Sequence, residues 1–132
     1  TPWSPLGGGI LSGKYNKGDK KGRVSQGNKL TKKRLAIAQA VIKVAQEMKV
    51  EPSQVAIRWV MQKHKAIIPI VGARTLNHVK VNMGVLDIEL SQESMEELDE
   101  VSKIELGFPH DFLKSDSVKS IVYSDTYDDI TK

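Results

Sequence analysis

The chain has 132 residues and a net charge of +4 at pH 7, from 20 basic and 16 acidic residues. It contains no cysteine, which excludes disulfides and thiolate metal sites and favours a reducing compartment. No apolar stretch approaches the roughly 18 residues that span a bilayer, and no signal peptide is visible. We therefore expect a cytoplasmic chain without membrane contacts.

The charges are distributed unevenly along the sequence. Nine basic residues from Lys14 to Arg34 are accompanied by a single acid, Asp19, whereas three aspartates stand between residues 125 and 129. The simpler interpretation is that both charge clusters are solvated surface. A basic lid over a phosphate-rich ligand is the sharper alternative for the first. Nucleic-acid binding is disfavoured, because the basic run has no interleaved aromatic residues and no recognisable binding module.

The first informative motif is WSPLGGGILSGKY, residues 3–15. Three consecutive glycines, Gly7 to Gly9, follow a Ser-Pro turn, and Lys14 comes shortly after them. Glycine has no Cβ, so its backbone amides can approach a phosphate closely. We predict the exit of a strand and a glycine-rich turn, followed by a mobile hydrophilic loop to about residue 30.

Two amphipathic helices are predicted between residues 31 and 64. Thr31 is a candidate N-cap for a helix that ends near Lys49, and Pro52 suits the first turn of a second helix that ends near Lys63. Apolar residues recur in both at helical spacing, which predicts core packing. They are Leu35, Ala38, Ile42, Ala45 and Met48 in the first helix, and Val55, Ala56, Trp59 and Val60 in the second.

The second informative motif is IIPIVGARTLNHVKVN, residues 67–82. Residues 66–71 are nearly all apolar and too few for a helix, so they predict a buried strand as in a parallel sheet, with Pro69 near its end. Gly72, Ala73 and Arg74 follow, directly before a predicted helix start, an arrangement that suits an anion. A single strand also needs neighbours for its backbone groups, which suggests that other parts of the sheet are missing.

Helices are also expected within residues 75–106, and a loop or tail over 107–132. Thr75 and Ser91 are the candidate N-caps, and Gly107 with Pro109 ends the second helix. The first helix contains Leu76, Val79, Asn82, Met83 and Leu86, and the second turns Met95, Leu98, Val101 and Ile104 inward.

In this order and at this spacing, the two motifs resemble the cofactor-binding half of an aldo-keto reductase. The resemblance extends from Trp3 to about Phe112 and implies an α/β fold: the C-terminal part of a (β/α)8 TIM barrel, mostly helical with one or two parallel strands. A complete barrel typically needs about 250 residues, and the sequence begins at Thr1 inside a motif. We therefore interpret residues 1–132 as one partial barrel, with the missing N-terminal part of the barrel as its partner.

Trp3 stands where tyrosine is commoner, which resembles the branch that includes bacterial general-stress reductases and potassium-channel β subunits. The resemblance implies that Trp3 stacks on the nicotinamide of NADPH. It implies further that Ser4, Leu6 and Gly8 approach the pyrophosphate and that Lys14 adds a charge there. Core packing of the tryptophan and a simple tight turn of the glycines are the alternatives.

Gly72, Ala73 and Arg74 match the stretch that wraps the adenosine 2′-phosphate, which favours NADPH over NADH because a guanidinium clasps a phosphate well. A surface ion pair is the alternative for Arg74. Asn82 matches an asparagine that contacts adenine. His78 and Val81 depart from the family pattern, and a valine cannot replace a carboxylate that accepts from the adenine amino group. The expected cofactor-binding residues are Trp3, Ser4, Pro5, Leu6, Gly8, Lys14, Gly72, Ala73, Arg74, His78 and Asn82.

The family's reaction uses a tyrosine as general acid, tuned by a lysine and an aspartate, with a histidine that orients the carbonyl. No segment here matches these four residues, so we assign no catalytic residue, and no cluster has metal-ligand spacing. We expect surface or packing roles for Tyr15, Tyr123, Tyr127, His64 and His110.

The leading hypothesis is a fragment of an NADPH-dependent aldo-keto reductase that reduces small aldehydes or ketones to alcohols, inactive when alone. One alternative is a non-catalytic nucleotide-sensing or channel-associated subunit of the same fold. Another is a helical fragment with no ligand of its own. The sequence leaves the oligomeric state open.

Overall fold

The structure is a computed structural model that describes residues 1–18 and 30–129. The chain divides into two compact units, Thr1–Ser102 and Lys103–Lys132, and each is described by itself. Most of the hydrophilic loop predicted to about residue 30, with much of the basic cluster, lies outside the described residues.

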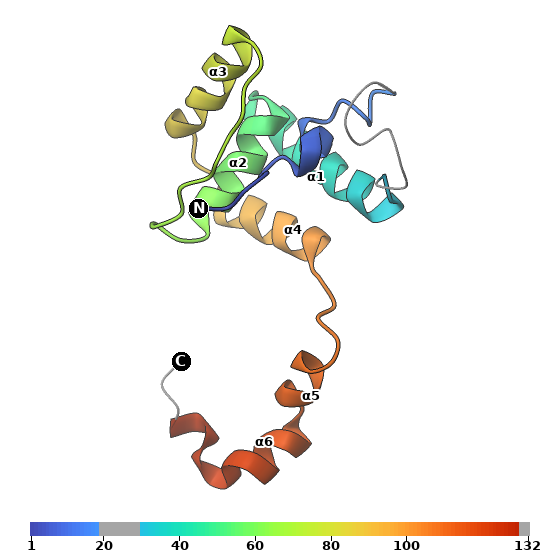
Figure 1. The fold of residues 1–132 in the computed structure, drawn as a ribbon, viewed down its shortest axis with the longest axis vertical. Coiled ribbons are helices and arrows are strands. Elements are labelled where there is room, and N and C mark those ends of the chain that lie inside the picture. The colour runs from blue at the N-terminus through green and yellow to red at the C-terminus, as the bar shows by residue number, and fades with distance from the viewer. Residues whose placement is uncertain (19–29, 130–132) are drawn as a thin grey trace. The chain divides into compact units, whose positions relative to one another are not determined.

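The first unit is helical. Figure 1 shows α1, α2 and α4 close together, with α3 beside α2. Among the described residues, no helix has both the length and the apolar character needed to cross a membrane. The elements are η1 (Gly7–Ser12), α1 (Lys32–Met48), α2 (Pro52–Gln62), α3 (Leu76–Met83), η2 (Gly84–Asp87) and α4 (Gln92–Ser102), where η marks a 3-10 helix.

The predicted helix starts are confirmed by their capping contacts. The hydroxyl oxygens of Thr31, Thr75 and Ser91 each accept from the backbone N–H three residues further on, at 3.2, 3.2 and 3.1 Å. Each cap satisfies one of the N–H groups that a first helical turn leaves without an intrahelical acceptor. Pro52 occupies the first turn of α2, where its missing N–H costs nothing.

The core of the first unit lies where α1, α2 and α4 meet. Ala38, Ile42 and Ala45 of the predicted α1 stripe are buried, and so are Val55 and Ala56 of α2. Leu98 is buried on α4 as predicted, and Met95 is partly buried beside it. The main cluster consists of Val41, Val44, Ala45, Val55, Ala56, Leu90 and Leu98.

α4 is shorter than predicted. It ends at Ser102 instead of continuing towards Gly107, and Ile104, which was expected to face inward, is 73% exposed. The Ser102 hydroxyl donates to the carbonyl oxygens of Leu98 at 2.6 Å and Asp99 at 3.2 Å. A serine that bonds back to the preceding turn competes with continuation of a helix.

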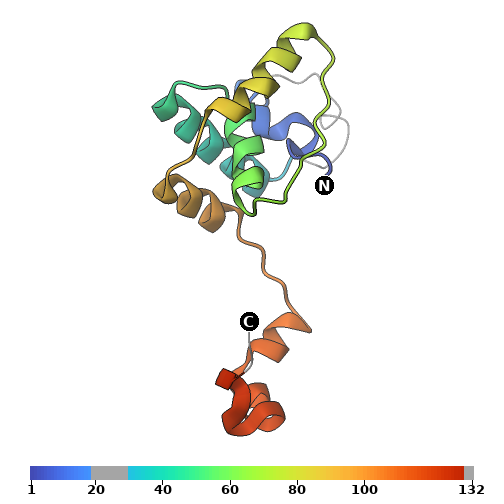
Figure 2. The ribbon, with the colours of Figure 1, turned by 90° about the vertical axis from the view of Figure 1, so that its left-hand side faces the viewer.

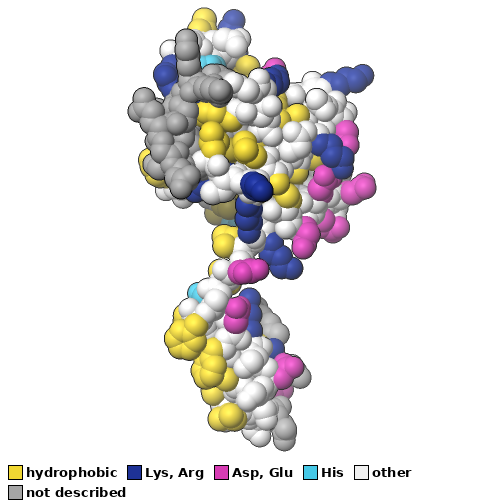
Figure 3. All heavy atoms as spheres, turned by 90° about the vertical axis from the view of Figure 1, so that its right-hand side faces the viewer, with side chains coloured by type: hydrophobic (Ala, Val, Ile, Leu, Met, Phe, Trp, Pro, Cys, Tyr) yellow, Lys and Arg dark blue, Asp and Glu magenta, His cyan; other side chains and the backbone are white. Residues whose placement is uncertain are grey.

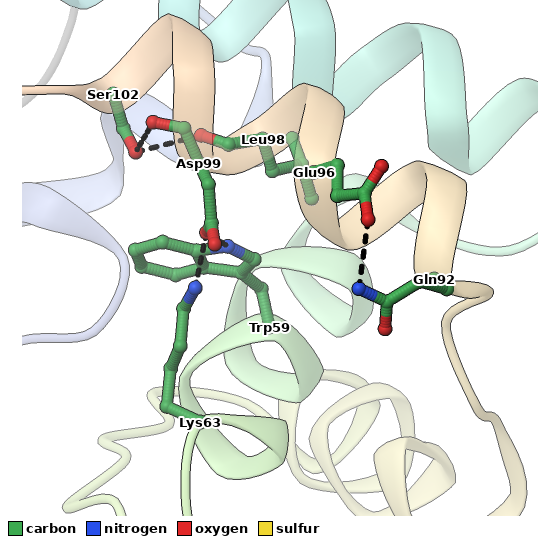
Figure 4. Close-up of polar contacts among 7 residues, drawn as sticks. All are labelled: Trp59, Lys63, Gln92, Glu96, Leu98, Asp99 and Ser102. Carbon is green, nitrogen blue, oxygen red and sulfur yellow. Dashed lines mark hydrogen bonds and ion pairs between the residues drawn. The ribbon is translucent and has the colours of Figure 1, made fainter.

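A polar cluster joins α2 to α4 next to this core (Figure 4). The Asp99 carboxylate accepts from Trp59 Nε1 at 2.8 Å and pairs with Lys63 Nζ. The Lys63 ammonium also lies 4.7 Å from the centroid of the Trp59 ring. The hydrogen bond from Lys63, together with that from Trp59, lowers the pKa of the Asp99 carboxyl.

The strand predicted over residues 66–71 does not form. Ile70 makes one parallel bridge with Trp3, and its N–H donates to the carbonyl oxygen of Pro2 at 3.0 Å. The burial expected in a complete parallel sheet is not found in this chain, where Ile68 is 69% and Ile70 55% exposed. A parallel strand needs partners along its length, and in the described part of the chain the segment around Trp3 offers only one. This part is therefore mostly helical, without an extended sheet.

The second unit corrects the loop or tail predicted for residues 107–132. Its described part forms α5 (His110–Lys114), α6 (Asp116–Tyr123) and η3 (Ser124–Asp129). The Ser115 hydroxyl caps α6 by accepting from the N–H of Val118, whose side chain is buried. The rings of Phe108 and Phe112 lie with centroids 5.9 Å apart. Ser115 and Asp116 of this segment stand at the start of α6, where such residues are favoured.

Hydrophobic side chains remain exposed on the surface of each unit (Figure 3). In the first unit they come from the segment around the Trp3–Ile70 bridge and from α3 with η2, and α3 has no buried residue. Trp3, Ile68, Ile70, Leu76, Val79, Met83 and Leu86 are all exposed. Exposed large apolar side chains of this kind favour association.

We predict that the isolated chain self-associates and takes up a dye that binds apolar surface, because Trp3, Ile68 and Ile70 have no cover. Light scattering and dye fluorescence measure both effects. The variant Ile68→Lys should lower the dye signal, since it places a charge in the middle of the exposed segment. A tight monomer that unfolds cooperatively without dye uptake would contradict this expectation.

A second prediction concerns pH. Because the folded-state pKa of Asp99 is lowered, its contacts stabilise the fold above the unfolded value of 3.8, and this contribution is lost as the pH falls through the folded-state value. The Asp99 side chain is 48% exposed, so we expect Asp99→Asn to cost only about 0.2–1 kcal/mol near neutrality.

Denaturant unfolding, followed below the concentration at which the chain associates, measures this difference. The gap between wild type and Asp99→Asn should close in acid. Asp87→Asn, at an exposed aspartate of η2, serves as the matched control. A gap that persists unchanged in strong acid would show that the carboxylate charge is not what joins α2 to α4.

Candidate cofactor site

A cavity of about 690 Å³ lies between the N-terminal segment, the start of α2 and the segment that leads into α3. Its volume is in the range of sites for small molecules and cofactors, roughly 300–1,000 Å³. All the residues predicted to bind cofactor line it: Trp3, Ser4, Pro5, Leu6, Gly8, Lys14, Gly72, Ala73, Arg74, His78 and Asn82. The two motifs therefore meet in one place, and cofactor binding by these residues stays a prediction.

Backbone pairing brings the two motifs together. The N–H of Ile70 donates to the Pro2 carbonyl oxygen at 3.0 Å, and Trp3 forms the parallel bridge with Ile70. Figure 2 shows the extended segment between α2 and α3 passing beside the N-terminus. The chain continues from the paired positions to Ser4 in one motif and to Gly72 in the other. Both residues consequently line the same cavity.

The first motif turns sharply as it leaves the bridge. Ser4 has φ of 58°, and its carbonyl oxygen accepts from the N–H of Gly7 at 2.9 Å. Gly7, Gly8 and Gly9 follow with φ of 55°, 70° and 93°, a run of left-handed conformations that glycine alone adopts readily. A non-glycine residue in this region is a strained position of the kind that gathers at binding sites.

Lys14 and Trp3 both line the cavity. A Cβ at Gly9 would lie 3.5 Å from Lys14 Cε, so the lysine stem runs along the glycine turn. Its ammonium is 4.9 Å from the centroid of the Tyr15 ring. Trp3 is 82% exposed, so it does not pack into the core of the described unit. Its indole faces are therefore accessible to a planar ligand.

The second motif presents a guanidinium and then one face of a helix. Arg74 directly precedes the N-cap Thr75 and is exposed. Within residues 1–18 and 30–129 its side chain has no hydrogen bond or ion pair, so the alternative of a surface ion pair is not observed there. His78 and Asn82 lie one helical turn apart on α3, and both line the cavity.

Sequence reasoning missed the contribution of α2. Glu51, its N-cap residue, and Ser53 in its first turn also line the cavity. They stand far from both motifs in sequence, so only their helix-start position signals them. The other lining residues outside the predicted set are Gly9, Ser12, Ile70, Val71, Asn77 and Val81.

One side chain holds α2 against α3 beside the cavity. Gln54 Oε1 accepts from the Glu51 N–H at 3.0 Å, and Gln54 Nε2 donates to the Val81 carbonyl oxygen at 2.9 Å. Gly84 makes this approach possible, because a Cβ there would lie 2.4 Å from Gln54 Nε2. The amide thereby ties the backbone of Glu51 to that of Val81.

The lining suits a ligand that is anionic in one part and flat in another. Lys14 and Arg74 are the lysine and the arginine of the lining. Glu51 is its only carboxylate among the described residues. An exposed tryptophan supplies a flat face, and the glycine turn allows close backbone approach. A nicotinamide dinucleotide fits this set of groups. Tyr15, Tyr123, Tyr127, His64 and His110 are not part of the lining.

Comparison with known proteins agrees with the motif resemblance. The profile of the Aldo/keto reductase family matches residues 1–103. A probable aryl-alcohol dehydrogenase of Saccharomyces cerevisiae is 34% identical over 123 residues, which are 88% of this chain and 37% of that protein. An aryl-alcohol dehydrogenase of Pestalotiopsis microspora is 30% identical over 112 residues, 85% of this chain and 29% of the relative.

A third relative is norsolorinic acid reductase A of Aspergillus parasiticus, 28% identical over 116 residues, 86% of this chain and 28% of that protein. The chain thus spans well under half the length of each of these three relatives. None of the three is named as a general-stress reductase or a channel subunit, so the branch suggested by Trp3 stays a prediction. Because the family profile matches most of its length, the chain belongs to the aldo/keto reductase family.

Proposed function

We propose that this chain is the cofactor-binding part of an NADPH-dependent carbonyl reductase of the cytoplasm. In the intact reductase, the general acid and its tuning partners come from preceding barrel segments. The chain supplies Trp3 for the nicotinamide, the Ser4–Gly8 turn with Lys14 for the pyrophosphate, and Arg74 for the 2′-phosphate. Two relatives are named as aryl-alcohol dehydrogenases, so aromatic alcohols and aldehydes are the substrate class to test first.

The observation that supports this proposal most is the meeting of both motifs in one cavity. Trp3 and Arg74 belong to segments far apart in sequence, yet the Trp3–Ile70 bridge places them in a common lining. A dinucleotide phosphate needs such an arrangement, because its ring system and its phosphates require different groups at separate points. The exposed guanidinium at the start of α3 suits the phosphate that distinguishes NADPH from NADH.

We predict that Arg74→Ala in the intact reductase weakens NADPH much more than NADH. A charge-assisted hydrogen bond is worth roughly 1.5–3 kcal/mol, about ten- to hundredfold in dissociation constant. The loss should shrink as salt rises, because Arg74 is exposed and its interaction is screened. Fluorescence titration with both cofactors at two ionic strengths measures the effect.

Lys80 provides the matched control for Arg74. It is an exposed cation of α3 that does not line the cavity. Lys80→Ala should leave the preference for NADPH unchanged, which separates a specific phosphate contact from the general positive field of the helix. Equal weakening of NADH and NADPH by Arg74→Ala would remove the arginine from the 2′-phosphate site.

We also predict that the chain alone does not reduce carbonyls. The cavity lining contains no tyrosine, and proton transfer by a positioned group contributes on the order of 10²–10⁴ in rate. The test incubates the purified chain with NADPH and 4-nitrobenzaldehyde and follows the absorbance of the reduced nicotinamide. Turnover above a buffer blank that disappears when Arg74 is replaced would place a complete active site within these residues.

The main competing proposal is a nucleotide-sensing or channel-associated subunit that binds NADPH without turnover. Such a subunit would have the same cavity as the reductase and would differ only in the residues that act on the carbonyl. The intact protein separates the two: NADPH binding with steady turnover of an aromatic aldehyde supports the reductase, and tight binding without turnover supports the sensor.

A further inference from the structure

Glu51 stands out in the cavity because its charge is opposite to that of the rest of the lining. Arg74 and Lys14 are cations suited to phosphates, whereas Glu51 is the only carboxylate that lines the cavity in the described part of the chain. A carboxylate repels phosphate and accepts hydrogen bonds without donating any. We therefore expect the Glu51 carboxylate to lie beside a part of the ligand that donates a hydrogen bond.

The position of Glu51 is set by α3, the helix that would face the adenine end of the ligand. Gln54 bonds to the Glu51 N–H at 3.0 Å and to the Val81 carbonyl oxygen at 2.9 Å, so one amide group spans the two backbones. Val81 and Asn82 line the same cavity. The Glu51 side chain accepts from the Gln54 N–H in the capping box of α2. Glu51 is exposed, so its second carboxylate oxygen is left for a ligand next to that part of α3.

We propose that the Glu51 carboxylate accepts a hydrogen bond from the exocyclic amino group of the bound adenine, an inference that rests on the proposed NADPH site. This amino group is the only hydrogen-bond donor on the adenine ring system once the base is attached to ribose. Val81 has no side-chain acceptor of its own. Glu51 consequently favours adenine over purines that carry an oxygen in place of this amino group.

The neighbouring polar residues do not provide this discrimination. Asn77 and Asn82 carry amides, each of which can rotate to donate or accept, and the Ser53 hydroxyl can do the same. Such groups adapt to an amino or a keto group alike. A carboxylate at the exocyclic position cannot donate to the keto oxygen of hypoxanthine, and it would have to shift to the ring N1–H to find a donor.

The test compares NADPH with deamino-NADPH, in which hypoxanthine replaces adenine and the rest of the cofactor is unchanged. Dissociation constants are measured on the intact reductase by calorimetry. For wild type, NADPH should bind at least about tenfold more tightly than deamino-NADPH, as expected for a hydrogen bond to a charged group. For Glu51→Ser, this ratio should fall to near one.

Serine is chosen because it is among the preferred N-cap residues, so α2 keeps a competent cap while the carboxylate is lost. The ratio of two cofactors measured on one variant also cancels any general loosening of the site. Glu47→Ser is the matched control, since Glu47 is an exposed acid on α1 that does not line the cavity, and it should keep the wild-type ratio.

The outcomes separate this inference from the proposed function. If wild type binds both cofactors equally well, or if Glu51→Ser keeps the preference for adenine, Glu51 is not the acceptor while NADPH binding stands. If wild type binds neither cofactor, both proposals fail. If Glu51→Ser weakens both cofactors by the same factor, the role of Glu51 is limited to the structure of α2, and the inference is overturned.

Discussion

The candidate site depends on one short stretch of backbone pairing. Trp3 and Ile70 form a single parallel bridge, supported by the hydrogen bond from the Ile70 N–H to the Pro2 carbonyl oxygen. Without this contact, each motif would be positioned only by the helices next to it. The glycine turn packs on α1 and α2, whereas Arg74 leads into α3. A contact between segments distant in sequence closes a long loop, which costs conformational entropy. The core of α1, α2 and α4 offsets this cost by fixing much of the intervening chain.

A second contact that shapes the site is made by the Gln54 side chain. Gln54 connects the start of α2 with α3, and Gly84 leaves the space into which this side chain fits. The contact is local in space but joins three separate sequence positions. It sets the distance between the helix that presents His78 and Asn82 and the helix start that presents Glu51. Packing between the helices thus determines which polar groups face each other across the cavity.

The features that could be predicted from the sequence are those that depend on near neighbours along the chain. Thr31, Thr75 and Ser91 cap helices because each bond spans three residues. The apolar stripes of α1 and α2 are buried or partly buried because a helix repeats every 3.6 residues. The strand predicted around Ile68 and Ile70 does not form, since a strand depends on partners elsewhere in the sheet. The prediction failed at Ile104 because a serine bonded to the preceding turn ends α4 early.

The same distinction between local and distant contacts decides which residues of the candidate site could be predicted. The eleven predicted residues could be chosen because they stand in two continuous motifs, whose order and spacing match a known family. Glu51 and Ser53 could not be chosen in this way, because a helix start with a proline resembles any other helix start. Their place in the lining arises only when Gln54 brings α2 against α3.

The exposed apolar surface and the candidate site share one location. Trp3 and Ile70 form the bridge, line the cavity and are largely exposed. The residues that bring the two motifs together are therefore also those that the first unit leaves without cover. Elements with few buried contacts open at low free energy, so this edge is held less firmly than the core around Val44 and Val55. Covering apolar groups placed against Trp3 and Ile70 would both bury this surface and fix the cavity, which couples completion of the fold to formation of the site.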